Sequence, residues 1–128
     1  MSFILLKSRL IAREIGEAQA QAVVEKEYLS ALTEGKNYMV LPSFCPWQKA
    51  LFDLEYKHDV PLYFVVYPDK VNGFRVQAVS TEYDGFTNRI DIEAVAGEAG
   101  CTFVHPSKFI AGFEDIDSAI ACVERLLN

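Results

Sequence analysis

The apolar residues at the start of the chain follow a helical period. Residues 3–34 contain no proline and a single glycine, Gly16, and are rich in strong helix formers, so they predict one long helix. Ser2 suits its N-cap and Gly35 the position after its last turn. Apolar residues recur three and four positions apart, with a break at Glu25, which is typical of a packed helix face: Ile11, Ile15, Ala18, Ala22, Leu29 and Leu32.

The length of this helix leaves two arrangements open. Thirty residues would span roughly 45 Å, whereas a compact chain of this size is about 36 Å across. The helix either breaks near Gly16 and packs on its own sheet, or it overhangs and packs on another chain. The second arrangement predicts a homodimer through the N-terminal helix.

The rest of the chain alternates between short apolar runs and turn signals. Two further helices are predicted at Trp47–Lys57 and Asp115–Leu127, and residues 81–99 are expected to be a loop with a turn of helix at 92–95. Five runs read as strands: Tyr38–Leu41, Pro61–Tyr67, Phe74–Ser80, Cys101–Val104 and Phe109–Gly112. The order predicts an α+β fold with a mixed, mainly antiparallel four- to five-stranded sheet covered by helices. We expect one domain over residues 1–128, with the long helix at about 3–34 and the α/β core at about 38–128.

Two turns define where side chains leave the sheet. Asn72-Gly73 is a strong hairpin signal, and the strand that follows it places Arg75 and Gln77 on the face opposite Phe74, Val76 and Ala78. His105-Pro106-Ser107-Lys108 lies between the last two strands and predicts a tight turn with His105 at a strand end.

Composition limits the classes of function. Hydrophobic residues make up 51% and charged residues 23%, and no apolar run reaches the roughly 20 residues of a membrane span. Three cysteines and two histidines without metal-type spacing predict reduced thiols, a cytoplasmic location and no metal or other cofactor. The net charge of −6 disfavours a nonspecific nucleic-acid binder but leaves room for a small basic groove.

Arg75 and Gln77 are the first candidates for binding, because a guanidinium beside an amide can hold a carboxylate, a phosphate or a base edge. Arg89 and Lys108 would add positive charge if the loop folds over that face. His105 can act as an acid, a base or a phosphate ligand, or it can hydrogen-bond its own turn through Ser107. The expected ligand is an anionic small molecule, a nucleotide end or a protein partner.

Cys45 is the candidate for nucleophilic chemistry. In Cys45-Pro46-Trp47 it precedes a predicted helix, whose dipole can lower a thiol pKa, while Gln48 stands where a redox motif would need a second cysteine. One alternative is a small hydrolase that uses Cys45 or His105, either alone or as a nucleophilic pair. The alternative is a structural role, in which Trp47 anchors the segment against the sheet.

Six segments in order give the chain a family likeness over nearly its whole length: Leu41-Pro42-Ser43-Phe44-Cys45-Pro46-Trp47, Tyr67-Pro68-Asp69, Gly73-Phe74-Arg75-Val76-Gln77-Ala78-Val79, Phe86 with Arg89, Gly100-Cys101-Thr102-Phe103-Val104-His105 and Phe109-Ile110-Ala111-Gly112. Together they resemble the C-terminal half of the melanocyte-proliferating-gene protein family, also described as DHH-like metal-dependent hydrolases or exonucleases.

The resemblance implies a role without the family's chemistry. Asp-His-His and His-Ala-Asp-Asp, which carry the metal in that family's N-terminal domain, do not occur in this chain. The resemblance therefore implies a non-catalytic accessory module that contacts a substrate at Arg75, Gln77, Arg89 and His105, with a catalytic domain supplied in trans. Ser107-Lys108-Phe109-Ile110-Ala111-Gly112 departs from the family's Ser-Gly-Phe-Ile-Gly-Gly by losing two glycines, and Lys108 brings a positive charge instead.

Overall fold

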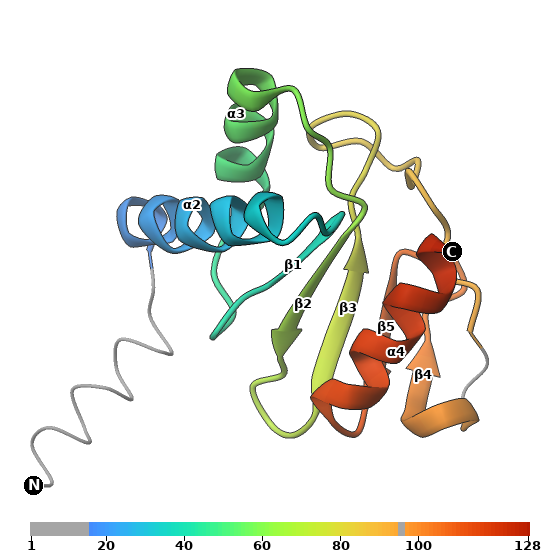
Figure 1. Ribbon diagram of the computed structural model, residues 1–128. Coiled ribbons are helices and arrows are strands. Elements are labelled where there is room, and N and C mark those ends of the chain that lie inside the picture. Colours follow the sequence, from blue (N-terminus) through green and yellow to red (C-terminus); the bar gives the residue numbers. More distant parts are fainter. Residues whose placement is uncertain (1–15, 95–96) are drawn as a thin grey trace, which may run out of the picture.

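The computed structural model describes residues 16–94 and 97–128, and its centre is a five-stranded sheet in the order β1-β2-β3-β5-β4 (Figure 1). The β1–β2 pair is parallel and the other pairs are antiparallel, which confirms the predicted mixed α+β fold. The strands are β1 (Tyr38–Val40), β2 (Phe64–Pro68), β3 (Phe74–Ala78), β4 (Cys101–Val104) and β5 (Ile110–Phe113). The helices are α2 (Glu17–Thr33), α3 (Gln48–His58), α4 (Ile116–Leu127) and the short 3₁₀ helix η1 (Glu98–Gly100).

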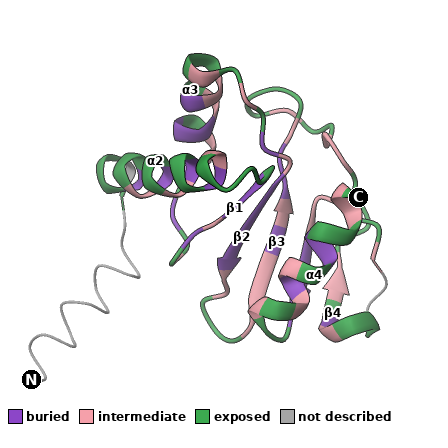
Figure 2. Cartoon of the chain, viewed as in Figure 1, coloured by how far each residue is buried: buried purple, intermediate pink, exposed green. Residues whose placement is uncertain are grey.

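The two faces of the sheet are covered unequally. The helix α4 packs on one face, where alternate residues of the central strands, among them Val66, Val76 and Ala111, are fully buried. On the other face α2 and α3 form a second core with Met39 and Val65 from β1 and β2 (Figure 2). That second core contains no residue of β3, β4 or β5, so the polar face of β3 is left without a helix over it.

The helix α2 buries a different face from the predicted one. In the structure Ala18, Ala22 and Leu29 are exposed, so their expected packing is wrong, and Leu32 is half-buried; Ile11 and Ile15 lie outside the described residues. The buried stripe is Ala20, Val24, Tyr28 and Ala31. Tyr28 decides the face, because its ring is fully buried and its hydroxyl donates to the Val60 carbonyl at 2.6 Å.

The N-terminal boundary of the long helix lies partly outside the described residues. Within them the helix begins at Glu17 with Gly16 as its N-cap, and it ends at Thr33, near the predicted position. Residues 3–15 of the predicted helix lie outside the described residues, so the homodimer expected from its overhang stays a prediction. None of the helices in the described ranges is both long and apolar enough to cross a membrane.

The segment that joins β3 to β4 carries no helical turn at residues 92–94, and residue 95 lies outside the described residues. Ile92 instead holds this segment against the sheet. Its side chain is fully buried in the core under α4, and its backbone N–H donates to the Lys108 carbonyl at 2.9 Å. The apolar spacing that favoured a helix there reflects single residues of an irregular segment that reach into the core. The other predicted helices and strands are confirmed within a few residues of their bounds.

Candidate functional site

A groove runs across the end of β3, where the sheet is not covered by a helix. Two adjacent cavities of about 390 and 410 Å³ share Gln48, at the start of α3, and Gln77, from β3. The first continues along residues 44–50 to Tyr83, and the second continues to Ser80, Asn88 and the turn between β4 and β5. The walls therefore come from four parts of the sequence: Gln21 of α2 and the segments 44–50, 77–88 and 107–109.

Aromatic side chains border this groove and are open to solvent. Phe44 is 42% exposed, Tyr83 51% and Phe86 100%. Phe44 leans on the ring of Tyr67 with centroids 5.1 Å apart, and Tyr83 meets Phe52 of α3 edge-on at 5.8 Å. Exposed flat rings beside amide groups are what stacking on a planar ligand requires.

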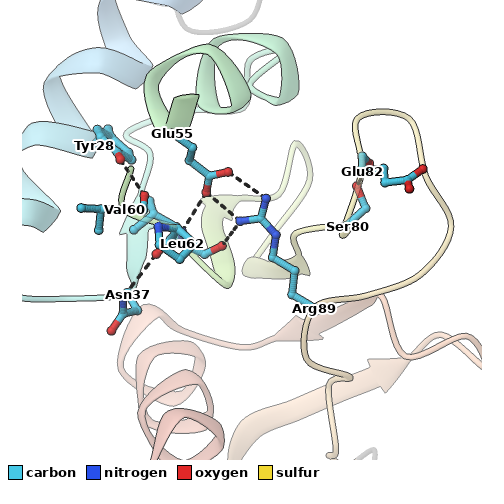
Figure 3. A network of polar contacts seen from close by, with 9 residues as sticks. Tyr28, Asn37, Glu55, Val60, Leu62, Ser80, Glu82 and Arg89 are labelled. Carbon is cyan, nitrogen blue, oxygen red and sulfur yellow. Dashed lines mark hydrogen bonds and ion pairs between the residues drawn. The ribbon is translucent and has the colours of Figure 1, made fainter. Parts of the chain in front are cut away.

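The loop that carries Tyr83 and Phe86 is fastened at its base by Arg89. Figure 3 shows Arg89 and Glu55 of α3 pointing toward each other, with two contacts of 2.7 and 2.8 Å. Arg89 also donates to the Leu62 carbonyl at 2.8 Å, and its guanidinium lies over the Phe52 ring. Both charged side chains are at least 86% buried. Arg89 therefore positions the loop, and its guanidinium does not face the groove.

Arg75 and Gln77 share a face of β3, as predicted, but they border different hollows. Arg75 pairs with Asp69 at 3.1 Å and lies over the Phe103 ring at 4.6 Å. It lines a third cavity of about 560 Å³ together with Thr102, Phe103, Gly112 and Glu114. The ring of Phe103 reaches across Gly112, where a Cβ would collide with it. The prediction that the two side chains lie on one face of the strand is confirmed. They line different cavities, so they do not face one common ligand position.

His105 and Lys108 belong to the predicted turn between β4 and β5. The Ser107 N–H donates to Nδ1 of His105 at 3.0 Å, which confirms that His105 hydrogen-bonds its own turn, and its ring packs edge-on against Phe109. Lys108 has a positive φ of 59° and pairs with Glu93 at 3.0 Å. A left-handed backbone favours glycine, which is the residue that the family resemblance implies at this position. The ligand-binding roles of His105 and Lys108 stay predictions.

All three cations that were expected to hold an anion have a carboxylate partner in the structure. Arg75 has Asp69, Arg89 has Glu55 and Lys108 has Glu93. Opposite charges at this distance cancel much of the field that would attract an anion. The groove itself is lined mainly by amides, hydroxyls and aromatic rings.

Cys45 does not have the properties of a nucleophile. Its side chain is fully buried in the core between the sheet and the helices α2 and α3, and burial raises the pKa of its thiol. This shift is opposite in direction to the lowering of the pKa that a helix dipole would produce. Trp47 is 3% exposed and packs in the same core, as the structural alternative requires.

We expect the three cysteines to react slowly with a thiol reagent while the protein is folded. All three are buried and free, and burial raises the pKa of Cys45, Cys101 and Cys122. Labelling with a chromogenic disulfide at pH 8 should be roughly a hundredfold slower than in urea. The unfolded thiols lose their protons first, so stability should also fall as the pH rises past the ordinary thiol pKa. A single fast thiol that Cys45→Ser removes would contradict this and revive the hydrolase hypothesis.

Several residues of the groove were not predicted from the sequence. Gln48, Ser80, Asn88 and Ser107 are ordinary polar residues, and nothing in their spacing indicates that they converge. The signal that could have found the groove is the segment Tyr83-Asp84-Gly85-Phe86, which puts two large aromatic rings in an otherwise polar loop. Such rings are exposed only where folding does not need them in the core.

Comparison with known proteins identifies the lineage of this α+β chain. The family model MYG1_exonuc, described as uncharacterised protein family UPF0160, matches residues 6–127, and the chain belongs to this family. It is 31% identical to the MYG1 protein of Dictyostelium discoideum over 104 residues, which are 70% of this chain and 32% of that protein. It is also 31% identical to the human MYG1 exonuclease over 97 residues, 65% of this chain and 26% of that protein. The Saccharomyces cerevisiae MYG1 protein is 30% identical over 107 residues, 73% of this chain and 31% of that protein.

The chain thus spans about a third or less of the length of these relatives. No solved structure gives a significant match. The resemblance noted from the six segments is confirmed at the level of this family.

Proposed function

We propose that this chain is a non-catalytic binding module of the MYG1 family, a single domain related to the C-terminal domain of DHH-like hydrolases, which holds a nucleotide end. The observation that carries the proposal is the groove that joins two cavities at Gln48 and Gln77. Amides can pair with a base edge, and the rings of Phe44, Tyr83 and Phe86 offer surfaces on which a base stacks.

The charge distribution favours recognition of the base over recognition of the phosphate. The candidate cations are each paired with a carboxylate, whereas two groove amides, Gln48 and the Nε2 end of Gln77, form no hydrogen bond among the described residues. One cation at the groove is exposed: Lys49, 70% exposed, whose contact with Asp53 is long at 3.5 Å. An exposed pair of this kind contributes little, so Lys49 can exchange Asp53 for a ligand phosphate at the edge of the groove.

The chemistry of the family would come from elsewhere. The matched relatives are about three to four times as long as the aligned region, and some of them are named exonucleases. A catalytic domain, supplied in trans or by further chain, would then act on a nucleotide that this module presents. The binding role needs no nucleophile here, in agreement with the buried thiol of Cys45.

We expect nucleoside monophosphates to bind at least about tenfold more tightly than ribose 5-phosphate or inorganic phosphate, because base stacking is worth about 1–3 kcal/mol. Isothermal titration calorimetry measures the three affinities. Phe86→Ala should weaken nucleotide binding by about tenfold while the melting temperature stays constant, since this ring is fully exposed. Tyr56→Ala is the matched control, as Tyr56 is an exposed ring on α3 that does not line the groove.

Two results would reject the proposal. One is the absence of binding by any nucleotide. The other is equal affinity for nucleotides and inorganic phosphate, unchanged in Phe86→Ala, which would move the site to the predicted cations instead.

A further inference from the structure

Gln77, at the junction of the two cavities, has a partner that fixes the direction of its amide. Tyr67 of β2 lies opposite Arg75, and the next pair on the same face of the sheet is Val65 with Gln77. Gln77 and Tyr67 are therefore on one face. The Tyr67 hydroxyl donates to Oε1 of Gln77 at 2.9 Å. Tyr67 is only 7% exposed, and its ring is held by Phe44.

The opposite orientation of the amide would leave a proton without a partner. If Nε2 of Gln77 donated to the Tyr67 oxygen, the phenol proton would need a second acceptor, and the described residues offer no other hydrogen bond to that hydroxyl. A buried hydroxyl without an acceptor costs free energy. Burial also raises the pKa of Tyr67 to about 12, so the phenol keeps its proton at neutral pH. Tyr67 is therefore a donor at neutral pH, and its hydrogen bond holds the carbonyl end of Gln77 toward the phenol.

The other end of Gln77 is directed to solvent. Nε2 has no hydrogen-bond partner among the described residues, and in that part of the chain no side-chain polar atom is both buried and unpaired. Nε2 is consequently accessible, and Gln77 lines both cavities. At the junction of the groove Gln77 thus directs its N–H groups to solvent, while Oε1 is turned toward Tyr67.

We propose that Tyr67 turns Gln77 into a fixed hydrogen-bond donor, so that the groove selects a base that presents a keto oxygen at this point over one that presents an amino group. This inference rests on the proposed function. Gln77 would contact the ligand, and Tyr67 would be a positioning residue that does not touch it. An amide free to rotate by 180° would accept either group.

The test compares ligands that differ at one exocyclic group and in the proton on the adjacent ring nitrogen: IMP with AMP, and UMP with CMP. The wild-type protein should bind the keto member of each pair about tenfold more tightly, because the amino member leaves a donor facing a donor. Tyr67→Phe frees the amide, so the preference should collapse to less than about twofold while the keto ligand still binds. Gln77→Glu should reverse the preference, since a carboxylate only accepts.

Tyr63→Phe is the control, because Tyr63 packs against the core on the α4 face. It should leave the preference unchanged, and melting temperatures show that each variant is folded. Equal binding of both members by the wild-type protein, or a preference that survives Tyr67→Phe, would overturn this inference and leave the nucleotide site standing. Absence of nucleotide binding would overturn both.

Discussion

Replacing Arg89 with methionine is expected to lower the free energy of unfolding by about 3 kcal/mol, with a fall in melting temperature of roughly 10 °C. The guanidinium forms two contacts with Glu55 and one with the Leu62 carbonyl, and both charged side chains are largely buried. Methionine keeps an aliphatic side chain but removes the guanidinium that lies over Phe52, and it leaves the carboxylate of Glu55 without its counter-ion. An unpaired buried charge costs far more than a solvated one.

A double-mutant cycle separates the ion pair from packing. Glu55→Met alone should also destabilise the protein, but Arg89→Met with Glu55→Met should cost clearly less than the sum, because neither charge is then left alone. The control is Asp53→Asn, which removes an exposed pair on the same helix and should change stability by less than about 0.5 kcal/mol. Urea unfolding gives all four values, and strict additivity of the two Met substitutions would contradict the argument.

The same contact explains why the role of Arg89 could not be predicted from the sequence. Glu55 and Arg89 are 34 residues apart, and their pairing is set by the fold. The sequence marked Arg89 as a cation over the β3 face, but it held no information that a carboxylate from α3 would reach it first. A hydrogen bond to the Leu62 carbonyl completes its neutralisation. Local patterns predict which residues carry charge, whereas tertiary contacts decide which charges are left over for a ligand.

The two faces of the strand β3 were easier to predict than the buried face of the helix α2. Strand alternation placed Val76 and Ala78 in the core and Arg75 and Gln77 outside it, because the period of two allows only these alternatives. In α2 the alanine-rich sequence offers two apolar stripes of similar spacing. Burial of Tyr28, the one aromatic residue of α2, settles which stripe faces the core. This burial depends on the Val60 carbonyl, which accepts from the Tyr28 hydroxyl and lies 32 residues away in the sequence.

The hairpin between β2 and β3 provides a second large effect, because Gly73 combines two constraints. Its φ of 83° lies in the left-handed region, which costs other residues about 1–2 kcal/mol. A Cβ at this position would also collide with the backbone oxygen of Phe113 in the neighbouring strand β5. Backbone atoms in a paired strand cannot move aside as a flexible side chain can, so Gly73→Ala is expected to cost about 3 kcal/mol in total.

Gly35 separates the two contributions to this cost. It follows α2 with a φ of 69°, but a Cβ there would meet no atom within 4 Å. Gly35→Ala should therefore cost about 1 kcal/mol, the backbone strain alone. Urea unfolding of the two variants tests the difference, and equal losses would show that the strand β5 yields to the added methyl group.

The Gly73→Ala substitution should not affect the groove at Gln77. Gly73 borders the separate cavity that Arg75 and Phe103 line. In the folded fraction of the variant, nucleotide affinity should therefore stay at the wild-type value.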